Sequence, residues 1–165
     1  MAQTKFGELT VNTVGELPAV GAPAPAFTLT GNDLKDVNSK DFVGRNVILN
    51  IFPSVDTGVC ATSVREFNKR AAGLANTAVI CVSKDLPFAM KRFCGAEGID
   101  KVITASDFRN RGFSKNYGVE MADGPFAGLD ARAVLVIDAQ GTVKHTELVP
   151  SVGQEPNYEA ALKAL

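Results

Sequence analysis

Apolar residues gather along the chain in short runs that are bounded by glycine, proline and polar residues. Continuous apolar runs of this length are typical of strands buried on both faces of a sheet. The runs predict strands at Val47–Phe52, Thr77–Ser83, Lys101–Ala105, Ala133–Asp138 and Thr142–Leu148. The remaining long segments predict helices, two of which begin at a proline suited to a first helical turn: Gly58–Ala72, Pro87–Cys94, Asn110–Tyr117 and Pro156–Leu165.

The order of these elements favours an α/β fold. Strand, helix and strand from Val47 to Ser83 predict a right-handed βαβ unit, and Ala139–Gly141 predicts the turn of a hairpin. We expect a sandwich in which a central mixed β-sheet is flanked by helices, in one domain over residues 1–165. At the N-terminus, Leu9–Leu17 alternates as a β-hairpin would, with a turn at Gly15.

Composition excludes some classes of partner. The chain has a net charge of −1 and no cluster of lysine or arginine, so neither nucleic acid nor an anionic membrane surface is expected as the main partner. The first residues lack the apolar core of a signal peptide, and the apolar runs are too short to span a bilayer. We therefore expect a cytoplasmic protein.

The cysteines are few and widely spaced: Cys60, Cys81 and Cys94. An odd number without a C-x-x-C pair indicates free, catalytic or metal-bound thiols rather than a disulfide framework. A metal site is disfavoured because the cysteines lie far apart and His145 is the single histidine. Nothing near His145 suggests acid–base catalysis, and we expect it in solvent.

Cys60 is the candidate for chemistry. It follows the predicted strand Val47–Phe52 and falls in the first turn of the next helix, where free backbone N–H groups and the helix dipole favour an anion. A cysteine so placed is expected to be partly thiolate, the form that attacks electrophiles. The alternative is a small buried residue, because free cysteines are commonly buried.

The residues before Cys60 admit two arrangements. Thr57 suits the N-cap, where its hydroxyl accepts from the Cys60 N–H or donates to the Cys60 sulfur. Alternatively, Asp56 is the N-cap and Thr57 is free to hold a substrate oxygen. Pro53 fixes the chain after the strand and shields the thiolate from water.

Pro53-x-x-x-Thr57-x-x-Cys60 matches the active-site signature of the peroxiredoxins. The longer string Asn50–Arg65 resembles their thiol peroxidase subfamily in particular. The resemblance continues in the same order over nearly the whole chain, through Asp85–Ala89, Arg92–Gly98, Ala122–Pro125 and Ala131–Ala133.

This resemblance implies a thioredoxin-like fold and a peroxide-reducing cysteine cycle without metal or organic cofactor. Cys60 would be the peroxidatic cysteine, whose thiolate attacks the O–O bond and becomes a sulfenic acid. Arg132, just before the strand Ala133–Asp138, would stabilise the charge. Taken without the resemblance, Arg132 is more readily interpreted as a surface arginine at the start of a strand.

The resemblance also implies that Cys94 is the resolving cysteine and forms an intramolecular Cys60–Cys94 disulfide, as in atypical 2-Cys enzymes. Cys94 ends the predicted helix from Pro87 and precedes Gly95, so we expect both helix ends to unwind when the sulfurs meet. Without the resemblance, Cys94 is equally a half-buried residue with no partner.

The implied substrates are hydrogen peroxide and organic hydroperoxides of the alkyl or lipid type, and the implied role is antioxidant defence. The implied reductant is thioredoxin, and the implied assembly is a homodimer. The aromatic and apolar residues expected along the substrate approach, or else in the core, are Phe88, Met90, Phe93 and Phe126. Cys81, inside an apolar strand, is expected to serve packing alone.

Two other functions are compatible with part of this prediction: one shares the fold, and the other shares the first chemical step. A thiol–disulfide oxidoreductase acting on proteins would normally carry C-x-x-C, which this chain lacks. A redox sensor would oxidise Cys60 and Cys94 once, whereas an enzyme would cycle with its reductant.

Overall fold

The structure, a computed structural model, describes residues 1–165. Seven strands form one sheet in the order β4-β3-β7-β6-β5-β8-β9, and β1 and β2 form a separate antiparallel sheet. The strands are β1 (Gln3–Phe6), β2 (Leu9–Asn12), β3 (Thr28–Gly31), β4 (Asp36–Asn38), β5 (Asn46–Ile51), β6 (Thr77–Ser83), β7 (Ile103–Ser106), β8 (Ala133–Ile137) and β9 (Val143–Leu148). The helices are η1 (Ser39–Phe42), α1 (Gly58–Ala71), α2 (Pro87–Glu97), α3 (Phe113–Asn116) and α4 (Tyr158–Lys163).

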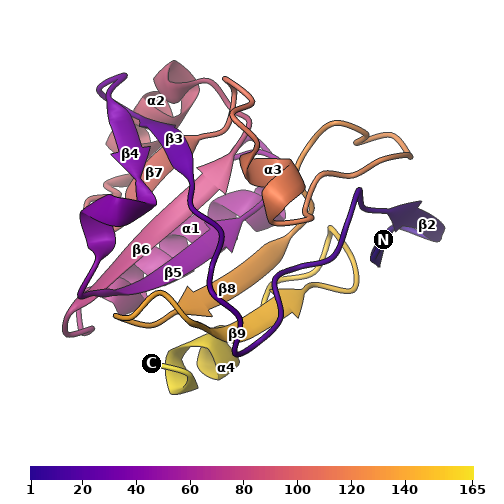
Figure 1. The fold of residues 1–165 in the computed structure, drawn as a ribbon. Coiled ribbons are helices and arrows are strands. Elements are labelled where there is room, and N and C mark those ends of the chain that lie inside the picture. The colour runs from indigo at the N-terminus through magenta and orange to yellow at the C-terminus, as the bar shows by residue number, and fades with distance from the viewer.

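The large sheet is mixed, as the sequence predicted. Strands β5, β6 and β7 run parallel, whereas β8 runs antiparallel to β5 and β3 antiparallel to β7. In Figure 1, α1 lies behind the sheet and α3 lies in front of it. The predicted α/β sandwich is therefore confirmed.

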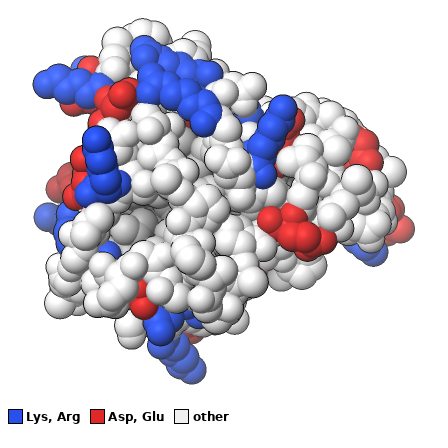
Figure 2. All heavy atoms as spheres, viewed as in Figure 1, with Lys and Arg blue, Asp and Glu red and all other residues white.

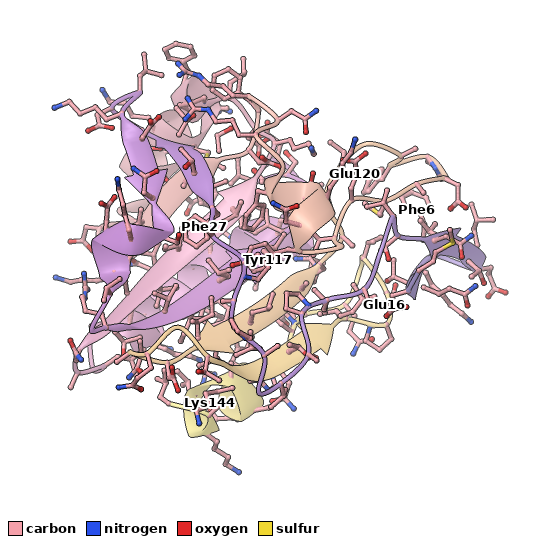
Figure 3. All side chains as sticks on the ribbon, in the orientation of Figure 1. Phe6, Glu16, Phe27, Tyr117, Glu120 and Lys144 are labelled. Carbon is pink, nitrogen blue, oxygen red and sulfur yellow. The ribbon has the colours of Figure 1, made fainter.

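The central strands are apolar throughout because both of their faces are covered. In β5, Leu49 and Ile51 belong to one apolar cluster, and the alternate residue Ile48 belongs to another on the opposite face. Helices α1, α2 and α4 contribute to the cluster around Ile48. The other cluster is closed by aromatic residues, among them Phe27 and Tyr117, which lie close together on the front face in Figure 3.

The predicted N-terminal hairpin exists, but its position along the chain was wrong. The turn lies at Gly7, whose φ is +60°, and not at Gly15. The alternating residues from Leu9 onward form the second strand, and its partner lies upstream at Gln3–Phe6. Glycine suits this turn because it adopts positive φ without steric cost.

Several helix boundaries also differ from the prediction, among them those of α4, which begins at Tyr158 and not at Pro156. Helix α2 continues to Glu97, because the left-handed residue that ends it is Gly98, with φ of 67°. Helix α3 does not begin at Asn110, because Asn110 and Gly112 both have positive φ and break the helical path. The hairpin β3–β4 and the short helix η1 were not predicted.

Charged side chains are scattered over the surface. On the face in Figure 2 both signs lie mainly around the edge, and the middle is largely uncharged. No helix is long and apolar enough to cross a membrane.

Candidate active site

The site lies where β5 ends and α1 begins. Cys60 occupies the first turn of α1, and its side chain is fully buried. Its neighbours in the apolar cluster include Phe52, Val55 and Phe93. The strand-to-helix connection thus places a thiol at a helix N-terminus, beyond the carboxyl end of a central strand.

Arg132 reaches this thiol from a distant part of the chain. Because β8 pairs with β5 in a register that sets Ala133 opposite Ile51, Arg132 lies at the same end of the sheet as Cys60. Its Nη2 donates a hydrogen bond to Cys60 Sγ at 3.1 Å. The contact joins residues 72 positions apart in the sequence.

The Arg132 guanidinium is itself buried and held by a backbone carbonyl. Its side chain is 1% exposed, and Nε and Nη2 donate to the Val152 carbonyl oxygen at 3.0 and 2.7 Å. Its Nη1 has no hydrogen-bond partner. Because no carboxylate is among its hydrogen-bond partners, the positive charge of this buried guanidinium is directed at the Cys60 sulfur.

The N-terminal hairpin fixes the segment that carries Val152. The Lys5 N–H donates to the Pro150 carbonyl at 3.0 Å, and the Val152 N–H donates to the Lys5 carbonyl at 2.9 Å. The Thr4 hydroxyl donates to the Val149 carbonyl at 2.8 Å. The hairpin therefore holds the carbonyl that orients Arg132.

Thr57 is the N-cap of α1, but its hydroxyl does not cap the helix. It donates to the Ser54 carbonyl at 3.1 Å, so both predicted contacts with Cys60 are wrong. The extended backbone of Thr57 turns the chain into the helix instead. The alternative, with Asp56 as the N-cap, is wrong, because the Asp56 side chain lies exposed and pairs with Arg92 at 3.4 Å.

A cavity of about 210 Å³ lies at the start of α1, where it is lined by the residues just before Cys60 and by Arg132, while the buried Cys60 side chain does not itself line it. Pro53, Thr57 and Arg132 all line it, so the structure brings these three predicted residues together next to Cys60. The rest of the lining is mainly apolar: Phe6, Gly58, Val59, Phe126, Val152 and Gly153. Phe6 and Phe126 meet edge to face with ring centroids 4.7 Å apart, and Phe6 lies beside the loop after Glu120 in Figure 3.

Cys94 lies in the last turns of α2 and is half-buried. Its Sγ is 3.7 Å from the Thr104 hydroxyl, and both it and Cys60 are free thiols. Cys94 packs against the apolar cluster that contains Cys60. Contrary to the prediction, it does not end its helix.

An ion pair holds the end of α2 on α1. Arg65 Nε and Nη2 donate to the two carboxylate oxygens of Glu97 at 3.1 and 2.8 Å. The hydrogen bond from Arg65 lowers the pKa of Glu97. Release of the last turn of α2 requires this pair to open or move.

Cys81 and His145 both lie in strands of the large sheet. Cys81 is fully buried in β6, where burial raises the pKa of its thiol to about 12. His145 is half-buried opposite Val136 in β8, and its Nε2 is buried without a partner, so the expectation of a solvated side chain was wrong. No group of three or more His, Cys, Asp or Glu side chains has metal-site geometry.

Of the four residues expected along the approach, Phe126 alone lines the cavity beside Cys60. Met90 and Phe93 are buried in the core, and Phe88 is exposed away from that lining. Helical spacing explains the difference, because α2 directs Met90 and Phe93 to the same side, toward the sheet.

Sequence reasoning missed several residues that shape the site. Val152 acts through its backbone carbonyl, which no residue type signals. Phe6 reaches the cavity through the docking of the hairpin. Asp85 contacts the loop before Cys60, and its position after a central strand was the available signal.

Comparison with known proteins agrees with this geometry. The family model described as Redoxin matches residues 19–162. Thiol peroxidases from Mycobacterium tuberculosis and Corynebacterium glutamicum are 65% and 53% identical to the chain, each match covering 100% of this chain and 99% of the relative. A crystal structure of a peroxiredoxin-like protein from Aquifex aeolicus superposes with a TM-score of 0.91 at 38% identity, covering 99% of this chain and 96% of that one. The chain belongs to the redoxin family, within the thiol peroxidase subfamily of the peroxiredoxins.

Proposed function

We propose that this enzyme reduces hydroperoxides, with Cys60 as the attacking thiolate and Arg132 as the charge-stabilising residue. The observation that carries the proposal is the 3.1 Å hydrogen bond from Arg132 Nη2 to Cys60 Sγ at the N-terminus of α1. The guanidinium and the helix dipole both favour the thiolate over the thiol. The membership in the thiol peroxidase subfamily supports the same chemistry.

The first step transfers one oxygen atom to sulfur. The Cys60 thiolate attacks the terminal oxygen of ROOH, an S–O bond forms and the O–O bond breaks. Cys60 becomes a sulfenic acid, and the leaving RO⁻ takes a proton from water to give ROH. Arg132 Nη1, which is buried without a hydrogen-bond partner, is the proposed donor to a peroxide oxygen.

The cavity supports organic hydroperoxides as substrates in addition to hydrogen peroxide. Its polar groups, from Thr57 and Arg132, lie near the thiol, and Phe6 and Phe126 provide an apolar wall. A substrate with one polar and one apolar end matches this lining. Pro53 at the cavity wall shields the thiolate from water.

In the second step, Cys94 attacks the Cys60 sulfenic acid. A disulfide forms within the chain, and the sulfenic oxygen leaves as water with two protons. Both sulfurs adjoin one apolar cluster but lie in separate helices. We expect the first turn of α1 and the last turns of α2 to unwind, because a disulfide requires Cα atoms within about 7 Å.

A dithiol reductant then returns both cysteines to thiols by thiol–disulfide exchange and is itself oxidised to a disulfide. Thioredoxin is the proposed reductant, in keeping with the resemblance noted in the sequence. We further propose that residues 1–165 act as one domain, that the enzyme is a homodimer, and that it serves antioxidant defence in the cytoplasm.

A coupled assay tests the proposal. Reduced protein is mixed with cumene hydroperoxide, thioredoxin, thioredoxin reductase and NADPH, and NADPH loss is followed for the wild type, Cys60→Ser, Cys94→Ser and the control Cys81→Ser. We expect sustained turnover in the wild type and in Cys81→Ser, none in Cys60→Ser, and failure to recycle in Cys94→Ser. A single stoichiometric oxidation in the wild type would instead indicate a redox sensor.

A further inference from the structure

A carboxylate at the end of β6 holds the loop that precedes Cys60. Asp85 Oδ1 accepts a hydrogen bond from the Ser54 hydroxyl at 2.7 Å. Its Oδ2 accepts from the Val55 N–H at 2.8 Å and from the Ser83 hydroxyl at 2.6 Å. Three donors therefore converge on one half-buried side chain, and two of them belong to the segment between Pro53 and Thr57.

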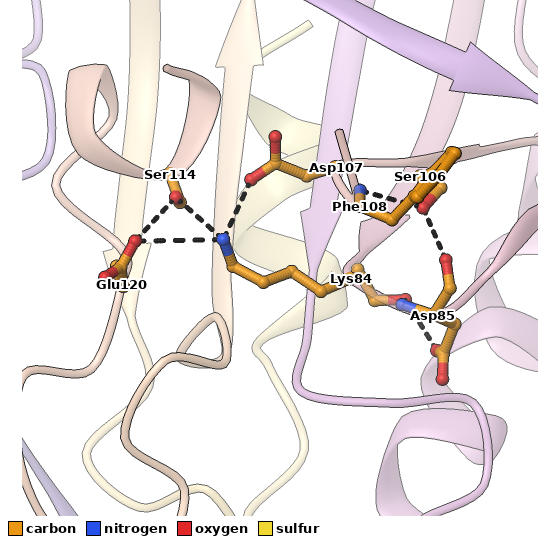
Figure 4. Close-up of polar contacts among 8 residues, drawn as sticks. Lys84, Asp85, Ser106, Asp107, Phe108, Ser114 and Glu120 are labelled. Atoms are coloured by element: carbon orange, nitrogen blue, oxygen red, sulfur yellow. Dashed lines mark hydrogen bonds and ion pairs between the residues drawn. The ribbon is translucent and has the colours of Figure 1, made fainter. Parts of the chain in front are cut away.

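The backbone of Asp85 is itself anchored. Its N–H donates to the Ser83 hydroxyl at 3.2 Å, and its carbonyl accepts from the Ser106 hydroxyl at the end of β7. Figure 4 shows this anchor, with the neighbouring Lys84 side chain directed the other way, toward Asp107 and Glu120. Asp85 thus projects its carboxylate from a fixed point on the central sheet.

The shape of the loop depends on the residues that Asp85 holds. The Ser54 carbonyl accepts from both the N–H and the hydroxyl of Thr57, each at 3.1 Å. The Ser54 hydroxyl also accepts from the Asp56 N–H at 3.1 Å. The Val55 side chain is buried in the apolar cluster that includes Cys60. A shift of Ser54 or Val55 would therefore move Thr57 and the start of α1.

From these contacts we propose that Asp85 is a positioning residue for the reaction of Cys60 with peroxide. It touches neither the sulfur nor the cavity lining, and it acts by holding the loop that places Thr57 and the first turn of α1. The inference rests on the proposed function. Asp85 belongs to the segment that leads into α2, so its carboxylate connects the loop before Cys60 to the start of the helix that carries Cys94.

This arrangement predicts different effects on the two chemical steps. Peroxide attack needs the loop in its folded form, whereas disulfide formation needs it to open. Removing the Asp85 charge weakens the folded form alone. We expect attack by Cys60 to slow and the subsequent formation of the Cys60–Cys94 disulfide not to slow.

Asp85→Asn is the test, because the amide keeps the shape but replaces one acceptor oxygen by a donor. Asp138→Asn is the matched control: Asp138 likewise holds a turn with its carboxylate, since its Oδ1 accepts two backbone N–H groups at 3.0 and 2.9 Å, but it lies at the far end of β8. Reduced proteins are mixed with cumene hydroperoxide in a single turnover without reductant. Sulfenic acid and disulfide formation are timed separately, and thermal unfolding is recorded.

We expect Asp85→Asn to lower the second-order rate constant for peroxide attack about 10- to 100-fold, because small misplacements of reacting groups have effects of that size. The control should stay within about twofold of wild type. An Asp85→Asn rate within about twofold of wild type would overturn the inference, as would equal slowing of both steps. If Asp85→Asn does not fold, Ser54→Ala, which removes one of the three contacts, decides by the same criterion. Wild-type protein that fails to react with peroxide would instead refute the proposed function.

Discussion

Cys60 and Cys81 are both fully buried in the same apolar cluster, yet their surroundings offer the two thiols different hydrogen-bond donors. Cys60 has the Arg132 guanidinium at 3.1 Å and lies at a helix N-terminus. Cys81 has the neutral Asn50 amide at 3.6 Å and lies inside a strand, where burial raises its pKa to about 12. We therefore expect the reactivity of these two thiols to depend on the hydrogen-bond donors beside each sulfur and not on burial alone.

The carboxyl groups repeat this contrast. Asp85 accepts three hydrogen bonds, whereas neither carboxyl oxygen of the buried Asp130 has a partner. Burial raises the pKa of Asp130 to about 8, and the neighbouring Asp107 adds to the shift. The available donors thus distinguish Asp85, which holds a loop, from Asp130, whose carboxyl group burial keeps protonated near neutral pH.

The largest expected effect comes from removing the donor that distinguishes Cys60. Arg132→Met should lower the rate constant of Cys60 with peroxide about 100- to 1000-fold, the usual effect of losing a buried charge-stabilising donor. Rapid-mixing kinetics of the reduced protein measure this. Arg45→Met, an exposed arginine outside the site, serves as the control. A loss of less than about tenfold would mean that the helix N-terminus suffices to activate the thiol.

The second prediction concerns Asp130 and pH. Its pKa rises from 3.8 to about 8 on folding, so its contribution to stability is present at low pH and is lost as pH rises through about 8. Asp130→Asn should flatten this fall and stabilise the protein at neutral pH by about 1–3 kcal/mol.

Denaturant unfolding across this pH range checks the effect of Asp130. Lys84, Asp107 and Glu120 face the same site and are present in wild type and variant alike, so the comparison of the two proteins reports the removal of the Asp130 carboxyl group. An unchanged slope of unfolding free energy against pH would show that Asp130 is ionised in the fold. Asp36→Asn, an exposed carboxylate paired with Arg111, is a control expected to leave the slope unchanged.

A smaller effect is expected at the third thiol, Cys94. Glu97→Gln weakens the pair with Arg65 that holds the end of α2, so formation of the Cys60–Cys94 disulfide after peroxide should accelerate by up to about threefold. Quenched time points analysed for disulfide measure it. Glu159→Gln, which breaks a similar exposed pair between α1 and α4, should not change the rate. A slower reaction in Glu97→Gln would show that the folded end of α2 assists disulfide formation.

The smallest effect is expected at Cys81. Cys81→Ser should keep the rate of peroxide consumption within about twofold of wild type, because the residue touches neither Arg132 nor the cavity. The coupled assay with thioredoxin and NADPH checks this. A loss of activity as large as that expected for Cys60→Ser would show that Cys81 takes part in the chemistry, and would contradict the difference proposed between the two thiols.

Much of the fold was predictable because its signals are local. Two apolar runs, Val47–Phe52 and Thr77–Ser83, predicted the central strands β5 and β6. Helix α1 was predicted to within one residue. The boundaries that failed at the hairpin turn, α2 and α3 depended on residues whose positive φ the pattern does not reveal, at Gly7, Gly98, Asn110 and Gly112. Family resemblance, rather than spacing, pointed to Arg132.

The sequence by itself determined that Cys60 stands at the start of a helix after a buried strand, since strand and helix patterns extend over neighbouring residues. The tertiary structure decided which groups meet that thiol. The β5–β8 register brings Arg132 to Cys60, and hairpin docking fixes the Val152 carbonyl that orients it. The Thr57 hydroxyl turned to Ser54 instead of Cys60. Neither a backbone acceptor nor the register of distant strands is encoded by the type of any one residue, so both are determined by the packing of the whole chain.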